Sequence, residues 1–459
     1  MIDQPVDGKA LRKEVPRSDH ASFAPDSRDP VQIIREQNSD RLQDLVPVRM
    51  SRMLHSPFAF YRGGAGLMAH DLATGTPNIG TDLLICGDAH ISNFGLFGSP
   101  ERRQLFDVND FDEAGFAPWE WDVKRLAASI MIAARDNSYT EEQGKHAVVS
   151  AVGTYRQRLN QLVQLGAVER YYVSVDVDTL TTVAAQADDQ SLEDLIEKTA
   201  KKARKRTSAR MVEKITASSG DGPPQIIADP PTLVPAPAAL TSIFENVYAS
   251  YLDSLRADVA ALLSQFTVLD WALRVVGVGS VGTRCFIVLL GREDASGETE
   301  TLFLQVKEAA ASVLQTYGRR GPAVMPPRAP SSGAQAFRVV AGQQILQAQS
   351  DLFLGHIPTM QGRDFYWRQF RDMKGSVATE LLTTDQFERY GAVCAAILAR
   401  AHSQSPASQT VAEYLGTGTT FDEAIAAFAV AYADQNEKDY AAVQAAVKSG
   451  LLPCAEDGV

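Results

Sequence analysis

Two acidic segments in the first quarter of the chain carry residue types suited to metal-assisted phosphoryl transfer. CGDAHISN holds Asp88 and, five positions later, Asn93, while FDVNDFDEAG holds Asp110 and Asp112. In phosphoryl transfer one carboxylate orients the attacking hydroxyl, and an amide and a second carboxylate hold the Mg²⁺ that neutralises the nucleotide phosphates. We therefore predict that Asp88 is catalytic. The predicted Mg²⁺ ligands are Asn93, Asp110 and Asp112.

The alternative for these segments is a polar turn, because Asp, Asn and Gly cluster wherever side chains bond to nearby backbone amides. Against it, the spacing from Asp88 to Asn93 matches that of kinase catalytic loops. The carboxylates between Asp107 and Glu113 also concentrate negative charge, which costs stability unless a cation or a basic group compensates. We expect His90, inside the first segment, to support the loop by hydrogen bonding and not to act as a base.

A glycine-rich motif, GVGSVG, lies much later in the chain. A dinucleotide-binding fold would follow such a motif with a helix, but here TRCFIVLL follows, whose β-branched and aromatic residues indicate a strand. Strand, glycine turn and strand is the order found in kinases, where backbone amides approach the phosphates. A plain glycine-rich hairpin is the alternative. The predicted nucleotide-binding residues are Gly277, Gly279, Ser280, Gly282 and Lys307.

Lys307 stands in LFLQVKEA, where a kinase keeps its phosphate-binding lysine, although a surface lysine at a strand end is the alternative. Kinases pair this lysine with a glutamate on the next helix, and QAFRVVAGQQILQAQS contains no carboxylate. The candidates left for that role are Gln343, Gln344, Glu308 and Asp351.

The composition excludes several classes of protein. The chain has 459 residues, 45% apolar and 22% charged, with a net charge of −12, which argues against a binder of nucleic acid or of membrane surfaces. The four cysteines are far apart, so neither a disulfide framework nor a zinc site is expected. The polar N-terminus lacks the apolar core of a secretion signal, and we expect a cytoplasmic protein.

Periodicity predicts the elements that position these motifs. Short strands are expected at 83–86 and 104–108, a β-meander from ALRVVGVG to LFLQVKEA, and a Pro-rich connector at 218–238. Helices are expected at 188–216, 240–264, 335–350, 385–402 and 420–448.

The predicted elements include all those of a kinase, but their order along the chain is permuted. The catalytic and metal segments (86–113) precede the glycine turn and lysine (277–307). Circular permutation is tolerated where the original termini lie at the surface and a linker can join them. We therefore predict an α+β, protein-kinase-like two-lobed fold that is circularly permuted. Its predicted divisions are an N-terminal arm lying on the surface or partly disordered (1–30), a C-lobe part with the catalytic and metal loops (31–217), a connector and bridging helix (218–264), an N-lobe-like β-meander and helix (265–375) and C-lobe helices (376–459).

Longer runs resemble a family of bacterial proteins of unknown function. They are LVPVRMSRMLHSPFAFYRG, CGDAHISNFG, FDVNDFDEAGFAPWEWDVKRLAAS, RVVGVGSVGTRCFIVLL, LFLQVKEA and YADQ. That family is distantly similar to the protein-kinase-like and aminoglycoside-phosphotransferase superfamily, whose GD-x-H-x-x-N loop resembles GDAHISN. The resemblance implies the roles given above for Asp88, Asn93 and Asp110, and it makes Asp122 a buried support for the catalytic loop.

The function expected from these residues is an ATP- and Mg²⁺-dependent phosphotransferase acting on a small-molecule hydroxyl. One alternative is transfer of AMP by the same site. The other is a pseudokinase that binds nucleotide or a partner without catalysis, which the missing helix glutamate favours. Arg62, beside a glycine pair, is expected either to contact phosphate or substrate or to form a structural ion pair. The acceptor and the oligomeric state stay open.

Overall fold

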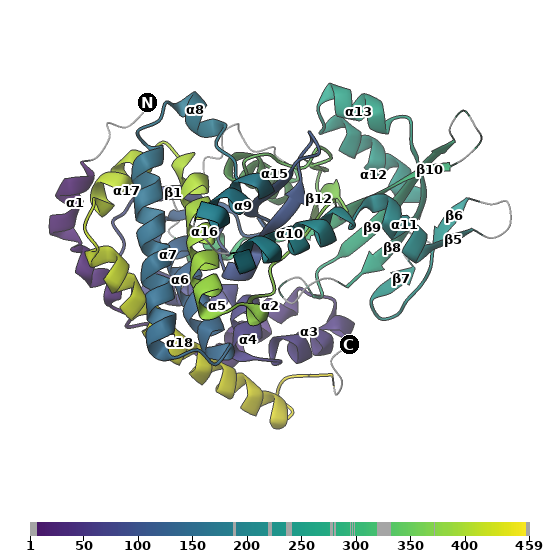
Figure 1. Ribbon diagram of the computed structural model, residues 1–459. Coiled ribbons are helices and arrows are strands. Elements are labelled where there is room, and N and C mark those ends of the chain that lie inside the picture. Colours follow the sequence, from purple (N-terminus) through teal and green to yellow (C-terminus); the bar gives the residue numbers. More distant parts are fainter. Residues whose placement is uncertain are drawn as a thin grey trace.

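The computed structural model describes residues 7–186, 190–218, 223–235, 241–275, 279, 281–293, 295, 297, 299–318, 332–370 and 372–455. Helices form one region and a six-stranded antiparallel sheet with its own helices forms the other (Figure 1). The protein therefore belongs to the α+β class, as predicted. No helix within the described ranges is both long enough and apolar enough to cross a bilayer.

The six-stranded sheet contains the predicted meander. Its strand order is β11-β12-β10-β9-β8-β7, all antiparallel. The strands are β7 (Leu233–Pro235), β8 (Thr267–Arg274), β9 (Cys285–Glu293), β10 (Thr299–Ala309), β11 (Gly355–His356) and β12 (Asp364–Gln369). An apolar cluster joins this sheet to helices α12 (Thr241–Asp253) and α13 (Ala257–Leu263), and in it the rings of Tyr251 and Trp367 stack at 4.5 Å.

The helical region is built around α6 (Glu120–Asp136), whose side chains from Glu120 to Ala134 are all buried. Helices α7 (Glu141–Leu162), α16 (Thr384–Ser403) and α18 (Thr420–Lys448) pack around it. The two strand pairs beside α6 are β1 (Asp82–Ile85) with β4 (Gly115–Pro118), and β2 (Phe94–Gly98) with β3 (Gln104–Val108). The acidic segments lie where the chain passes between these two strand pairs, CGDAHISN between β1 and β2 and FDVNDFDEAG from the end of β3 to the start of β4.

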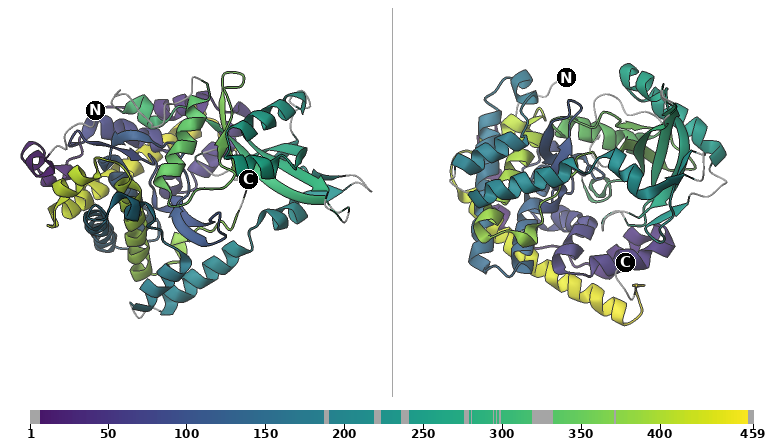
Figure 2. Two further views of the ribbon diagram at one scale, coloured as in Figure 1. Left: turned by 90° about the horizontal axis from the view of Figure 1, so that it is seen from above. Right: turned by 45° about the vertical axis from the view of Figure 1, so that its right-hand side comes forward.

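Four short helices link the two regions, and the end of α18 reaches the first of them (Figure 2). They are α2 (Pro30–Ser39), α3 (Val46–Met53), α4 (Pro57–Gly63) and α5 (Ala65–Gly75). The remaining elements are α8 (Ala167–Tyr171), α9 (Val177–Gln186), α10 (Gln190–Arg204), α11 (Ser208–Ile215), β5 (Thr216–Ser218), β6 (Pro224–Ile226), α14 (Val313–Tyr317), α15 (Ala334–Leu346), α17 (Ser408–Leu415) and the 3₁₀ turns η2 (Gln43–Leu45), η3 (Ile91–Asn93) and η6 (Thr379–Leu381).

Two predicted helices are divided in the structure. The one expected at 188–216 breaks between α10 and α11, where the Thr207 side chain accepts a hydrogen bond from the Arg210 backbone N–H and so starts a new helix. The helix expected at 240–264 breaks between α12 and α13. The helix expected at 335–350 ends at Leu346. The helices predicted at 385–402 and 420–448 are confirmed within a residue.

The N-terminal segment, predicted as an arm lying on the surface or partly disordered, packs on the C-terminal helices, and most of its residues between 7 and 30 are exposed or half-buried. Helix α1 (Gly8–Glu14) lies on α17, and the 3₁₀ turn η1 (Arg17–Ala21) lies on α18. The His20 ring is fully buried, and its Nε2 lies 2.8 Å from the Tyr414 hydroxyl. The buried hydrogen bond of His20, together with those of Arg28 to Asp71 and Asp439, ties this largely exposed segment to the body of the protein.

Candidate active site

Helix α6 holds the segment that follows strand β1 in place by hydrogen bonds. The Asp122 carboxylate accepts hydrogen bonds from the backbone N–H groups of Cys86 (2.8 Å) and Gly87 (2.9 Å), and His402 Nε2 lies 3.2 Å from it. Gly87 has a φ of +78°, and a Cβ there would lie 2.5 Å from the Glu113 carbonyl oxygen, so the turn requires glycine. Asp122 therefore lies where the resemblance places it, beneath the loop of Asp88.

The Asp88 carboxylate is held by an arginine one turn along the same helix. Arg125 Nε donates to Asp88 Oδ1 at 2.8 Å. Burial raises the pKa of Asp88 above its usual value, and Arg125 opposes that shift. Burial also lowers the pKa of His90 well below its usual value, so this ring, with Nε2 3.8 Å from Asp88 Oδ2, is neutral at neutral pH. Nδ1 of His90 is buried without a partner among the described residues, so the hydrogen-bonded support predicted for this side chain is not found there.

Asn93 closes the same turn. The side-chain Nδ2 of Asn93 donates to the backbone carbonyl oxygen of Asp88 at 2.7 Å. The backbone carbonyl oxygen of Asn93 accepts from the Asn109 backbone N–H at 2.8 Å. The second of these bonds ties the two acidic segments together one residue before Asp110. The first uses the amide nitrogen of Asn93, so the side-chain oxygen is the atom left to bind a cation.

Lys307 and the second acidic segment meet across 195 positions of sequence. Lys307 Nζ lies 2.5 Å from Asp112 Oδ2, and the Tyr366 hydroxyl donates to Asp112 Oδ1 at 2.6 Å. Burial acts to lower the pKa of Lys307, but Asp110 and Asp112 together raise it well above its usual value. The lysine is therefore a buried, fully charged group. Both oxygens of Asp112 are engaged, so the metal role predicted for Asp112 competes with its bond to Lys307.

Lys307 therefore has Asp112 as its carboxylate partner. The four candidates named from sequence have other contacts or surroundings. Glu308 pairs with Arg284 and Arg363, and Asp351 accepts from the backbone N–H groups of Phe353 and Gln369. Gln343 donates to Gln347. Gln344 lines a cavity beside Asp351 and Leu352.

Helix α15, where a kinase would carry its glutamate, contributes an arginine instead. The Arg338 guanidinium donates to the carbonyl oxygens of Asp112, Ala114 and Ala310, each at 2.8 Å. It therefore ties the acidic segment to the end of strand β10. Neither this contact nor Tyr366 was predicted, although strand alternation could have found Tyr366, because it lies directly opposite Lys307 in the β10–β12 pair.

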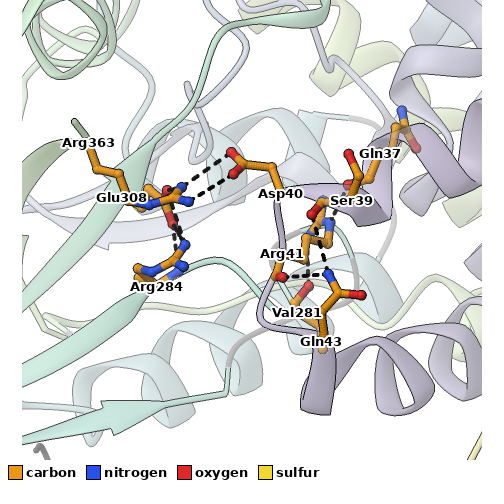
Figure 3. Close-up of polar contacts among 9 residues, drawn as sticks. All are labelled: Gln37, Ser39, Asp40, Arg41, Gln43, Val281, Arg284, Glu308 and Arg363. Carbon is orange, nitrogen blue, oxygen red and sulfur yellow. Dashed lines mark hydrogen bonds and ion pairs between the residues drawn. The ribbon is translucent and has the colours of Figure 1, made fainter. Parts of the chain in front are cut away.

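The glycine turn is described in part. Gly277 and Ser280 lie outside the described residues, whereas Gly279 and Gly282 lie within them. Gly282 has a φ of +87°, and its carbonyl accepts from the Leu42 backbone N–H at 2.8 Å. Arg41 donates to the Val281 carbonyl at 2.5 Å (Figure 3). The loop that follows α2 therefore holds the glycine turn by hydrogen bonds to the carbonyls of Val281 and Gly282.

An ion-pair chain anchors the same loop to the sheet. Arg363, at the start of β12, bonds to Asp40 at 2.9 Å and to Glu308 on β10, and Glu308 also accepts from the Arg284 backbone N–H (Figure 3). Glu308 is buried and Arg284 and Arg363 are half-buried, but the Asp40 side chain is exposed, so the Asp40–Arg363 pair is open to solvent. The chain links the loop after α2 to strand β10.

A cavity of about 410 Å³ lies where these segments meet. Its lining includes Asp88, Asp110 and Asp112 from the acidic segments and Gly279 from the glycine turn. The other charged lining residues are Glu36, Asp40, Arg41, Arg49, Arg62, Glu113 and Glu308.

The residues near Asp110 suit Mg²⁺. Burial, followed by the neighbouring Asp112, raises the pKa of Asp110, so a cation would relieve an unfavourable charge. Among the described residues no three His, Cys, Asp or Glu side chains are grouped as a ligand set. Mg²⁺ needs no such set, because it is commonly held by one or two protein oxygens together with phosphate oxygens and water. Asp110 and the side-chain oxygen of Asn93 fit that chemistry.

Comparison with known proteins identifies the family. The chain belongs to the family described as "Uncharacterized protein conserved in bacteria (DUF2252)", whose model matches residues 41–446. Every predicted site residue, from Arg62 to Lys307, lies within that span. No curated protein and no solved structure matches the chain.

Proposed function

For this family member we propose an ATP- and Mg²⁺-dependent phosphotransferase that acts on a small-molecule hydroxyl. One observation carries the proposal: Lys307 from the sheet bonds to Asp112 in the wall of the cavity that Asp88 and Asp110 also line. A lysine, a catalytic-loop aspartate and a metal-binding aspartate around one cavity are the parts that phosphoryl transfer needs. They come from two segments that the sequence separates by almost 200 positions.

The arrangement of the elements supports a protein-kinase-like fold with circular permutation as part of this proposal. The β8–β9–β10 meander, helix α15 and β12 would form the nucleotide-covering lobe. The helices around α6 would form the catalytic lobe, which the chain enters before the sheet and re-enters at α16. Helix α16 packs on α7 and beside β1 and β3, so it lies under the loop of Asp88.

Each residue of the chain would act through the contacts described above. Asp88, held by Arg125, would orient the acceptor hydroxyl and receive its proton. Asn93 and Asp110 would hold Mg²⁺, and Lys307 would stabilise charge on the phosphates. When bound, Mg²⁺–ATP supplies the phosphoryl group and the charge neutralisation. Arg62 would contact phosphate or substrate, since no ion pair of Arg62 is found among the described residues.

The first experiment is calorimetric titration with ATP, with and without Mg²⁺, on the wild type and on Asp110→Ala. We expect binding that depends on Mg²⁺ and that is lost in Asp110→Ala. Asp258→Ala serves as the control, because this carboxylate is exposed on α13 and is not part of the cavity lining.

The outcomes separate the candidate functions. Mg²⁺-dependent binding that is lost only in Asp110→Ala supports the site and justifies an acceptor screen, in which product mass distinguishes phosphate from AMP transfer. Binding that ignores Mg²⁺ points to a pseudokinase. No nucleotide binding by the wild type refutes the proposal.

A further inference from the structure

Three arginines line the cavity without a carboxylate partner. They are Arg41 from the loop after α2, Arg49 from α3 and Arg62 from α4, and we call them the cavity arginines. Elsewhere in the described chain, the buried arginines Arg28 and Arg156 bond directly to aspartates. Arg338 has no carboxylate partner either, but its donors are used on four neutral oxygens. Arg49 and Arg62 differ from both kinds, because among the described residues each has a buried Nε without any partner.

The hydrogen bonds of the cavity arginines go to neutral groups. Arg41 donates to the carbonyls of Gln37 and Val281. Arg49, which is 1% exposed, donates to the Asn38 side-chain oxygen (2.7 Å) and to the Gly63 carbonyl (3.0 Å), and its Nε is buried without a partner. Donors therefore remain free on a cation that is almost entirely enclosed.

Arg62 is the least satisfied of the three. Its Nε is also buried without a partner, and no hydrogen bond of its guanidinium is found among the described residues. Burial lowers the pKa of Arg62 despite the opposing fields of Asp88 and Glu380. Burial likewise lowers the pKa of Arg49, and the nearby charge of Arg41 lowers it further. Repulsion between two cations beside a cavity is relieved when an anion binds there.

The carboxylates of the same cavity do not supply that anion, because most of them already have partners. Asp112 is bonded to Lys307, Asp88 to Arg125, and Asp40 with Glu308 to Arg363. Glu113 accepts from the Val313 backbone N–H, and Glu36 accepts from Gln32. Among the described contacts, one carboxylate oxygen without a protein donor remains on each of Asp88, Asp110, Glu113 and Glu36. The proposed function assigns the open oxygen of Asp88 to the acceptor hydroxyl and that of Asp110 to Mg²⁺.

The position of the arginines indicates which ligand they would bind. The Arg62 carbonyl lies 3.9 Å from the place of a Cβ on Gly279, and the Arg41 side chain lies directly against Gly282. Arg41 thus lies at the glycine turn, and Arg62 lies close enough to Asp88 to feel its charge, so the cavity arginines extend from the turn toward the loop of Asp88. An acceptor whose hydroxyl reaches Asp88 would extend toward them.

We propose that the cavity arginines bind an oxyanion on the acceptor, so that the substrate is an anionic hydroxy compound such as a phosphorylated or carboxylated small molecule. This inference rests on the proposed function, because it takes Asp88 as the residue that meets the acceptor hydroxyl. A polycationic acceptor such as an aminoglycoside offers no anionic group to the unpartnered donors of Arg49 and Arg62.

The test uses inorganic phosphate as the probe in calorimetric titrations. The wild type, Arg62→Gln and Arg62→Lys are each titrated alone and after saturation with Mg²⁺ and a non-hydrolysable ATP analogue. Arg35→Gln is the matched control, because Arg35 is exposed on α2 and lies outside the cavity lining.

We expect phosphate to bind the wild type in the presence of the nucleotide analogue. Arg62→Gln should weaken that binding by about 10- to 100-fold, because it removes a charge-assisted hydrogen bond. The phosphate affinity of Arg62→Lys should lie between those of the wild type and Arg62→Gln. Arg35→Gln should bind phosphate as the wild type does. Affinity for the Mg²⁺–nucleotide complex should stay within a few-fold of the wild type in Arg35→Gln.

Three results would overturn the inference. They are an absence of phosphate binding by the wild type, phosphate affinity unaffected by Arg62→Gln, and exclusion of phosphate by the nucleotide analogue, which would show that the arginines hold the triphosphate. All three leave the proposed function standing if the Mg²⁺–nucleotide complex binds. Failure of nucleotide binding in the wild type is the separate result that refutes the proposed function.

Discussion

Two buried charge clusters in this protein differ in how completely their members are paired. In the first, the Arg28 guanidinium bonds to all four carboxylate oxygens of Asp71 and Asp439 at 2.5–3.0 Å, and Tyr432 also donates to Asp71. In the second, around the cavity, Asp88 and Asp110 have raised pKa values. Arg49 and Arg62 there keep donors without partners.

The difference separates a charge cluster that holds the fold together from one that can bind a ligand. A closed set of ions, each satisfied by another, stabilises one arrangement of the chain and offers nothing to a ligand. An open set costs stability in the unliganded protein, and a ligand with complementary charge recovers that cost. The Arg28 cluster joins the N-terminal segment to α5 and α18, whereas the cavity cluster lies between the two regions of the molecule.

The largest effect on turnover is expected from Asp88→Asn. The amide keeps the shape of the side chain but cannot accept the proton of the acceptor hydroxyl, so turnover should fall by up to about 10⁴-fold. Calorimetry should show affinity for Mg²⁺–ATP within a few-fold of wild type, because Asp88 is not a predicted metal ligand. Unchanged turnover in Asp88→Asn would refute the assignment of the site.

The largest effect on stability is expected from Arg28→Met, which leaves two buried carboxylates facing each other. The free energy of unfolding should fall by about 3–5 kcal/mol in urea denaturation. Arg256→Met, which removes an exposed arginine paired with Asp258, should change it by less than about 0.5 kcal/mol. Below the unfolding transition, Arg28→Met should bind Mg²⁺–ATP as the wild type does. A comparably small effect of both variants would erase the contrast between the clusters.

Arg125→Gln should change the pH profile of turnover. Burial raises the pKa of Asp88, and removing Arg125 removes the charge that opposes this shift, so the pKa should rise further. Because the carboxylate must be ionised to accept a proton, activity is lost as the pH falls through that pKa. The acidic limb of the profile should therefore move up by roughly one pH unit or more. Arg125→Lys keeps the charge and should shift it less.

The smallest effect is expected from Tyr366→Phe. This change removes one hydrogen bond to Asp112 and leaves the Lys307 pair in place, so turnover should fall only a few-fold, equivalent to about 1 kcal/mol. Removal of the lysine in Lys307→Met, measured beside it, should cost far more. Equal losses in the two variants would mean that Tyr366, and not Lys307, controls the position of Asp112.

Much of the local architecture was predicted from the sequence. The meander, the strand that carries Lys307, the pair of acidic segments and the helices at 385–402 and 420–448 all follow from residue periodicity and motif spacing. These features depend on neighbours within a few positions of sequence, which is the range over which alternation and helical repeats act. The same local reasoning missed the breaks near Thr207 and between α12 and α13, where capping and turns override the apolar pattern.

The sequence by itself determined which side chains could do chemistry and on which elements they lie, because residue type and spacing are properties of the chain alone. Only the tertiary structure decided that Asp112 pairs with Lys307, that Arg28 joins the N-terminal segment to α5 and α18, and that Arg41, Arg49 and Arg62 line one cavity. These contacts join segments that are far apart in sequence, and whether a charge is paired or open depends on burial and on the docking of helices against the sheet. Both are set by the packing of the whole chain.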